Sequence, residues 1–336
     1  MRESVALPMS EPSQVGEARR VAMALAGRLG FNEVERSKVG IVVTELANNL
    51  VRYAKDGVLL LHEMSREAIA GIEILSLDKG PGIDNISECL QDGFSTGSTP
   101  GNGMGAIQRL SSFFDIYSMP NIGTAIAAHV WADPVDIQAV KPSGKLDLGV
   151  VCLPKDGEEI SGDTWASSSR DQACLILVAD GLGHGPQAAQ AAIEAVRVFD
   201  EQHHQSPKEI VMVAHQALRS TRGAALAIAQ INFDTQTLDY AGVGNIAGAI
   251  LTANSHVNLV SLNGTVGYAV RKVQEFSYAW HSSGLLIMHS DGLGTQWHLD
   301  RYPGLSQKHP SLIAGVLYRD YNRGRDDVTV LVARER

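Results

Sequence analysis

The feature that most constrains the fold of this chain is a segment rich in turn signals between Trp131 and Asp147. The segment, WADPVDIQAVKPSGKLD, contains two prolines and a Pro-Ser-Gly triplet, and apolar patterns lie on both sides of it. Such residues interrupt regular elements and are common in linkers. We therefore predict a linker at 136–145 that divides the 336-residue chain into domains at 1–135 and 146–336. Both lengths are usual for one domain.

The composition indicates a folded protein and limits its partners. Hydrophobic residues make up 44% of the chain and charged residues 19%, which is typical of globular proteins. The net charge of −9 argues against nucleic acid and membrane lipid as main partners, since both attract basic surfaces. We expect a cytoplasmic protein, because the sequence shows neither a long apolar run nor the apolar core of a signal peptide. The 3 cysteines lack metal-ligand spacing and agree with a reducing compartment.

Hydrophobic periodicity predicts a different mixture of elements in each domain. In the first domain we expect helices and then strands, at 15–29, 37–54, 57–64, 71–77 and 124–131. In the second domain we expect many strands, at 145–154, 173–179, 224–233, 237–244, 247–253 and 284–290, with long helices at 186–202 and 207–220. The second pattern favours a β-sandwich that is covered by helices.

Glu45 and Asn49, in the sequence TELANN, are four residues apart within the second predicted helix. This spacing places both side chains on one face of the helix, at the edge of its apolar stripe. A carboxylate and a carboxamide at that position could activate a hydroxyl group and hold Mg2+ through oxygen. The alternative is a polar helix flank without a chemical role.

A tight turn, in the sequence LDKGPGIDN, follows the strand predicted at 71–77. Asp78 ends the strand, and Gly80 and Gly82 flank a proline. An ionised aspartate only accepts hydrogen bonds, so Asp78 could accept one from the exocyclic amine of adenine. The glycines would let the backbone approach the ring. An ordinary turn is the alternative, because these residue types are common in turns.

A glycine-rich stretch, GFSTGSTPGNGMGAIQRL at 93–110, precedes a helix that we predict from Ala106 to Phe114. Gly101, Gly103 and Gly105 alternate just before this helix, where backbone N–H groups can bind anions. The stretch lacks the Gly-Lys-Ser/Thr of a P-loop and the strand-turn-helix context of a Rossmann turn. It therefore predicts a phosphate-binding loop of another type.

Four aspartates follow or adjoin apolar strands in the second domain: Asp163, Asp180, Asp291 and Asp326. Strand ends can converge in a sandwich, and several carboxylates close together would repel one another unless a cation neutralised them. Oxygen ligands suit Mg2+ or Mn2+, and two such ions could activate a water molecule for attack on phosphorus. For any single Asp-Gly pair, an ordinary turn is the alternative.

The motifs of the first domain, taken together and in this order, resemble GHKL-type ATPases over about residues 15–131. The matching sequences are ELANN, DKGPG, GNGMG and the pair Gly123-Thr124. Within that superfamily the domain is most similar to the small serine/threonine protein kinases that control bacterial sigma factors. The resemblance implies a GHKL (Bergerat) α/β sandwich that binds ATP and Mg2+.

The same resemblance implies roles for single residues. Glu45 would be the general base that accepts the proton of a protein hydroxyl, Asn49 would hold Mg2+, and Asp78 would read adenine. The other residues implied in ATP binding are Gly80 and Gly82 at the purine, Gly101 and Gly103 at the phosphates, and Gly105 and Thr124 nearby.

From about Lys145 to its C-terminus the chain resembles the PPM metal-dependent protein phosphatases, in particular their SpoIIE-like branch. The matching sequences are SGD, VADGLGHG, RGAALAI, GVGN, MHSDGL and RDDVTVLV. The resemblance implies an α-β-β-α sandwich with two Mn2+ or Mg2+ ions. The implied ligands are Asp163, Asp180, Asp291, Asp326 and the backbone carbonyl of Gly181, with Asp327 ranked after Asp326.

These resemblances imply an α+β protein that joins a serine/threonine kinase to a phosphoserine and phosphothreonine phosphatase. In the resembled pathway of stress and sigma-factor regulation by partner switching, both activities act on STAS-domain proteins, so a STAS-domain partner is implied. Two alternatives stay open. The first domain could bind ATP only as a sensor that gates the phosphatase. The chain could also be a module that binds a sigma factor or an anti-sigma partner.

Overall fold

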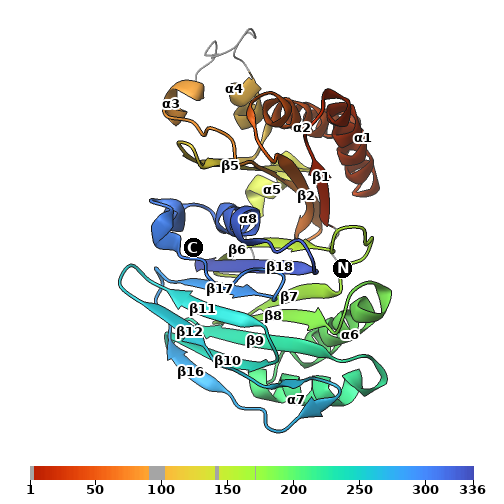
Figure 1. Cartoon of the computed structure of the whole chain (residues 1–336), viewed down its shortest axis with the longest axis vertical. Helices are drawn as coiled ribbons and strands as arrows, with labels where there is room; N and C mark the ends of the chain where they lie inside the picture. Colours follow the sequence, from red (N-terminus) through yellow and green to blue (C-terminus); the bar gives the residue numbers. More distant parts are fainter. Residues whose placement is uncertain (1–3, 91–102, 141–143, 171) are drawn as a thin grey trace. The chain divides into compact units, whose positions relative to one another are not determined.

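The computed structural model describes residues 4–90, 103–140, 144–170 and 172–336. The fold is α+β, as the sequence predicts, and the chain forms two compact units (Figure 1). The N-terminal unit comprises Arg2–Ser143 together with Leu299–Arg319, and the C-terminal unit comprises Gly144–His298 and Asp320–Arg336. A short segment from near the end of the chain therefore belongs to the N-terminal unit, which no sequence pattern indicated.

An antiparallel five-stranded sheet is the centre of the N-terminal unit. Its strand order is β1-β2-β3-β5-β4. The strands are β1 (Ser4–Pro8), β2 (Val58–Arg66), β3 (Ile69–Leu77), β4 (Phe113–Met119) and β5 (Gly123–Trp131). Successive side chains of a strand point to opposite faces, so each strand supplies apolar groups to both sides of this sheet.

Helices α1 (Pro12–Arg28) and α2 (Glu33–Tyr53) cover one face of the sheet (Figure 1). Their apolar stripes form one core with the sheet side chains that point toward them, among them Leu59, Ile72 and Ile126. Three shorter helices complete this part of the chain: α3 (Ile86–Cys89), α4 (Gly103–Leu110) and α5 (Pro134–Ala139). Helix α5 therefore begins two residues before the linker predicted at 136–145.

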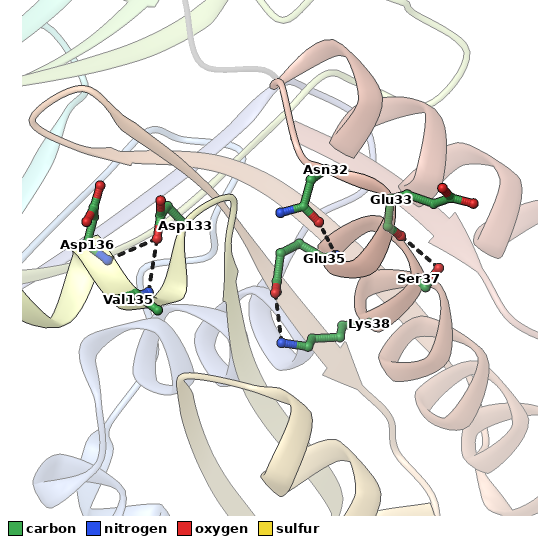
Figure 2. A network of polar contacts seen from close by, with 8 residues as sticks. All are labelled: Asn32, Glu33, Glu35, Ser37, Lys38, Asp133, Val135 and Asp136. Atoms are coloured by element: carbon green, nitrogen blue, oxygen red, sulfur yellow. Dashed lines mark hydrogen bonds and ion pairs between the residues drawn. The ribbon is translucent and has the colours of Figure 1, made fainter.

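Side-chain caps fix where α2 and α5 begin, as Figure 2 shows. Asn32 accepts a hydrogen bond of 2.9 Å from the backbone N–H of Glu35, whose carboxylate pairs with Lys38 at 2.8 Å. Asp133 accepts hydrogen bonds from two backbone N–H groups in the first turn of α5. Such caps satisfy N–H groups that have no partner within the helix. The cap thus fixes the residue at which α2 begins, and α2 is the helix that carries Glu45 and Asn49.

The segment Leu299–Arg319 lies on the other face of the sheet. It contains two short 3₁₀ turns, η2 (Leu299–Arg301) and η3 (Leu305–Gln307), and most of helix α8 (Pro310–Tyr321). The Oγ of Ser311 donates a hydrogen bond to Glu73, and a Cβ on Gly315 would lie 2.9 Å from Cδ2 of Leu77. Because Glu73 and Leu77 alternate with Ile72 and Ile74 on β3, these contacts lie opposite α1 and α2.

The C-terminal unit contains two packed sheets, whose strand pairs are antiparallel except for the parallel pair of β10 with β13. The first has the order β13-β10-β9-β8-β7, with β16 also paired to β10, and the second has the order β12-β11-β17-β18-β6. The first sheet comprises β7 (Asp163–Ser169), β8 (Ala173–Gly181), β9 (Ala224–Asn232), β10 (Thr237–Val243), β13 (Ser261–Leu262) and β16 (Phe276–Ala279). The second comprises β6 (Leu146–Leu153), β11 (Ala247–Leu251), β12 (His256–Leu259), β17 (Leu285–His289) and β18 (Val328–Glu335).

Two cores hold the C-terminal unit together. One lies between the sheets and includes Val178, Tyr240 and Met288. The other lies between the first sheet and the helices α6 (Pro186–Gln202) and α7 (Pro207–Ala217), which are followed by η1 (Leu218–Ser220). A small ribbon of β14 (Gly264–Thr265) and β15 (Ala269–Val270) adjoins β9. Two sheets with helices on an outer face are the sandwich that the sequence predicts.

One predicted element was wrong. The helix expected from Ala106 to Phe114 begins at Gly103 and ends at Leu110, and β4 starts at Phe113. The backbone N–H of Ser112 donates to the carbonyl of His129, so the sheet ladder takes over there. Strands β1 and β7 and helix α8 were not predicted. None of the helices in the described residues is long and apolar enough to cross a membrane.

The cap on α2 gives a stability prediction. Replacing Asn32 by Ala removes the hydrogen bond to Glu35 N–H, and caps of this kind contribute about 1 kcal/mol. We expect the midpoint of thermal unfolding of the N-terminal unit to fall by about 2–4 °C, measured by scanning calorimetry. Asn32→Asp keeps an acceptor at the cap and should unfold close to the wild-type temperature. An equal loss in both variants would contradict the assignment of the cap.

Candidate functional site

Helix α2 places Glu45 and Asn49 half-buried at the edge of the N-terminal core. The first residue of α4, Gly103, lies beside them, since a Cβ on Gly103 would be 2.6 Å from Oε2 of Glu45. A side chain at Gly103 would therefore require the carboxylate of Glu45 to shift. Gly105 is buried two residues further along α4, whereas Gly101 lies outside the described residues. The structure thus brings the predicted base and part of the predicted glycine loop together.

Asp78 lies directly after β3, and its carboxylate accepts hydrogen bonds from the backbone N–H groups of Gly80 at 2.6 Å and Thr124 at 3.4 Å. Burial raises the pKa of Asp78, and these two hydrogen bonds and the positive charge of Arg319 act in the opposite direction. The net result is a pKa above the usual value for aspartate. Asp78 is therefore held in place through its backbone and its carboxylate.

Two glycines allow neighbouring backbone segments to pack closely at the turn that contains Asp78. At Gly123, with φ at +133°, a Cβ would lie 1.9 Å from the carbonyl oxygen of Asp78. At Gly82, with φ at +74°, a Cβ would lie 2.2 Å from the carbonyl oxygen of Met119. Positive φ also disfavours any other residue at both places. The DKGPG turn and the Gly123-Thr124 pair therefore form one packed corner, although 40 residues separate the two motifs.

Asp163 and Asp180 lie opposite each other in the ladder between β7 and β8. Asp163 is 1% exposed, and within the described part of the chain its Oδ1 has no hydrogen-bond partner. Burial and the charge of Asp180 raise the pKa of Asp163 well above its usual range, although Ser290 donates to Oδ2 at 2.5 Å. A buried carboxylate oxygen without a donor requires a proton or a cation.

Asp291 and Asp326 reach the same cluster from β17 and β18. Burial and the charges of Asp291, Asp326 and Asp327 raise the pKa of Asp180 to about 7. Asn245 donates a hydrogen bond of 2.6 Å to Asp291. Among the residues described, no three of these aspartates have oxygens mutually within 4.8 Å. The residue type nevertheless suits Mg2+ or Mn2+, which prefer carboxylate oxygens as ligands.

Asp327 has a structural use that distinguishes it from Asp326. Its two carboxylate oxygens accept hydrogen bonds of 2.9 Å from the backbone N–H groups of Lys155 and Gly162. Asp326 is half-buried and uses one oxygen to accept from the N–H of Asp327. Asp327 thus ties β18 to the loop before β7, and Asp326 stays the predicted ligand.

Gly181 ends β8, and its backbone is pressed against α6, where a Cβ would lie 2.1 Å from the carbonyl oxygen of Ala188. Nearby, His184 is exposed and pairs with Glu158 at 2.7 Å. Sequence reasoning gave no role to Ser290 or Asn245. Both hold aspartates of the cluster, and the only signal for them was their place in MHSDGL and GVGN.

A second polar cluster lies in the N-terminal unit, where ligand atoms of Glu73, His129 and His309 are within 4.8 Å of one another. Burial would raise the pKa of Glu73, but hydrogen bonding and charge from His129, the charge of His62 and a hydrogen bond from Ser311 bring it to about 2. Glu73 is thus already compensated by protein groups, and we interpret this cluster as a structural contact between β3, β5 and the segment Leu299–Arg319.

The fold and these residues define the class of protein: a nucleotide-binding type of domain joined to a metal-dependent phosphatase type of domain. Comparison with known families agrees with both halves. The family described as histidine kinase-like ATPase domain matches residues 9–128. The family described as stage II sporulation protein E (SpoIIE) matches residues 170–336. The chain belongs to the histidine kinase-like ATPases through its N-terminal part and to the SpoIIE phosphatases through its C-terminal part.

Individual relatives divide the chain in the same way. Serine/threonine-protein kinase RsbT of Bacillus subtilis (strain 168) is 33% identical over 114 residues, which are 34% of this chain and 86% of RsbT. Phosphoserine phosphatase RsbX of the same organism is 28% identical over 143 residues, 42% of this chain and 71% of RsbX. A solved structure described as part of the bacterial stressosome has a TM-score of 0.54 at 28% identity, and the match covers 56% of this chain and all of the other.

The crowded carboxylates give a prediction for the protein without metal. Replacing Asp180 by Asn removes one repelling charge, so we expect the free energy of unfolding at pH 7.5 to rise by on the order of 2 kcal/mol. Added Mn2+ should stabilise the wild type and stabilise the variant less. Calorimetry with and without chelator measures both effects. Asp234→Asn, in the exposed turn after β9, is the matched control and should change neither.

The same group predicts how stability depends on pH. Because the pKa of Asp180 rises from 3.8 to about 7 on folding, the folded state binds more protons than the unfolded state between these values. Stability of the metal-free protein should therefore fall as pH rises from about 4 to 7. The fall should be shallower in Asp180→Asn. Equal slopes in the two proteins would contradict the electrostatic crowding.

Proposed function

We propose that this protein is a bifunctional switch that phosphorylates and dephosphorylates a protein partner on serine or threonine. The observation that supports the proposal is that one chain carries residues predicted for both sites. Glu45, Asn49 and Asp78 are present in the ATPase-type domain. The phosphatase-type domain gathers its aspartates around a buried carboxylate oxygen that lacks a donor.

In the kinase reaction ATP is the phosphoryl donor. Glu45 would accept the proton of the partner's hydroxyl as oxygen attacks the γ-phosphorus, and ADP leaves. Asn49 would hold the Mg2+ ion, and Asp78 would accept a hydrogen bond from the adenine amine. Gly103 lies beside the carboxylate of Glu45, which would have to shift if residue 103 had a side chain. Rate acceleration would come mainly from positioning and charge neutralisation.

In the phosphatase reaction two Mn2+ or Mg2+ ions would activate a water molecule toward phosphorus. Asp163, Asp180, Asp291, Asp326 and the carbonyl of Gly181 would hold them. Ser290 keeps Asp163 oriented by donating to one oxygen, which leaves the other oxygen for a cation. Asn245 orients Asp291 in the same way. The chain therefore supplies both the ligands and the donors that fix them.

The proposed partner is a STAS-domain protein of a stress-response or sigma-factor pathway, in the cytoplasm. The support is that the two halves resemble a kinase and a phosphatase named for the same system, RsbT and RsbX, and that one structural relative is a stressosome component. A kinase and a phosphatase with one target would set its phosphorylation level by their relative rates.

A second function is favoured by one contact, the hydrogen bond from Arg319 to the carbonyl of Asp78. It ties the predicted adenine-reading residue to a segment between Asp291 and Asp326. In this alternative the N-terminal domain is an ATP sensor that regulates the phosphatase and transfers no phosphate.

The kinase activity is tested with a STAS-domain substrate, radiolabelled ATP and Mg2+. The protein carries Asp180→Asn and Asp291→Asn, so that the phosphatase does not remove the label. We expect label on the substrate and a loss of at least about 100-fold when Glu45→Ala is added, with ATP binding retained. Glu33→Ala, an exposed position on the same helix, is the control. ATP binding without any transfer would leave the sensor function as the better description.

The phosphatase activity is tested with phosphorylated substrate and Mn2+ on the Glu45→Ala protein. We expect release of phosphate that stops when metal is chelated. Asp291→Asn should reduce turnover by about 100-fold or more, because a metal ligand and its charge are lost. Asp234→Asn should leave turnover unchanged. Metal-independent release, or release unaffected by Asp291→Asn, would exclude the proposed site.

A further inference from the structure

The segment Leu299–Arg319 contacts the N-terminal sheet through several specific bonds. Lys308 pairs with Asp115 at 2.9 Å, and the backbone N–H of His309 donates to the same carboxylate at 3.2 Å. Ser311 donates to Glu73 at 2.5 Å. Rings of Phe113 and His309 are 4.6 Å apart. The segment is therefore fixed to β3 and β4 by charges, hydrogen bonds and packing.

Arg319 extends this contact to the predicted adenine site. Its side chain is 7% exposed, and its NH1 group donates a hydrogen bond of 3.0 Å to the carbonyl oxygen of Asp78. That oxygen is also covered by Gly123, which has room for no side chain. The main chain of Asp78 is thus held between Gly123 and Arg319. A shift of Arg319 would move Asp78 or leave its carbonyl without this donor.

We propose that Arg319 is a positioning residue for the predicted adenine site: it fixes the main chain of Asp78, and thereby the carboxylate that would accept a hydrogen bond from adenine. The proposal rests on the proposed function, since it needs the N-terminal site to bind an adenine nucleotide. Loss of the Arg319 side chain would remove a buried donor from the carbonyl of Asp78 and allow the residue to shift.

The test uses the full chain and measures the Kd of a non-hydrolysable ATP analogue and of its GTP counterpart. A displaced Asp78 should reduce the preference for adenine, because its carboxylate would no longer be aligned with the adenine amine.

The variants are Arg319→Met, Arg319→Lys and Arg301→Met. Arg319→Met should weaken binding of the ATP analogue several-fold and reduce the preference for it over the GTP analogue. Arg319→Lys keeps the charge and a donor and should recover part of each effect. Arg301 lies in the same segment with an exposed side chain, so Arg301→Met should match the wild type.

Two results would overturn the proposal. Wild-type affinity for the ATP analogue and wild-type adenine preference in Arg319→Met would remove the role of Arg319 and leave the proposed function in place. A wild type that binds no adenine nucleotide would remove both. If Arg319→Met does not fold, Arg319→Lys decides the question, since it should show a partial loss of adenine preference.

Discussion

The N-terminal unit depends on covering both faces of a five-stranded sheet. Each strand alternates its side chains, and β3 and β5 carry buried groups on both sides, among them Leu75 and Ala127 opposite the helices α1 and α2. Exposing such a face to water would cost free energy in proportion to its apolar area. Helices from the first 54 residues cover only one face. The segment Leu299–Arg319 covers the other, which is why that unit is built from two distant parts of the chain.

In the C-terminal unit the main constraint is electrostatic and not apolar. Several negative aspartates lie close together, and packing alone does not neutralise their charge. The antiparallel register of β7 and β8 sets Asp163 against Asp180, and β17 and β18 add Asp291 and Asp326. The surrounding donors, Ser290 and Asn245, satisfy only part of this set. Repulsion within this cluster of carboxylates lowers the stability of the folded protein. The proposed metal-binding function would account for why the cluster is present.

Local sequence patterns predicted much of this arrangement, and long-range pairings set the rest. Periodicity located α2 and therefore Glu45 and Asn49 on one face, and the apolar run at 71–77 located Asp78 at a strand end. No pattern shows that Gly123 packs on Asp78, since that contact depends on the register of β3 with β5. The same is true of Ser290: a serine next to an aspartate gives no signal, and its partner Asp163 is 127 residues away.

The discontinuous unit also has a consequence for folding. The bond between Ser311 and Glu73 spans 238 residues, and the one between Arg319 and Asp78 spans 241. Contacts of such separation form late, because a long loop must close before they stabilise anything. The second face of the N-terminal sheet therefore stays uncovered until residues 299–319 have been synthesised. Because this segment follows β17, strands β6 to β17 of the C-terminal unit are made before the N-terminal sheet receives its second cover.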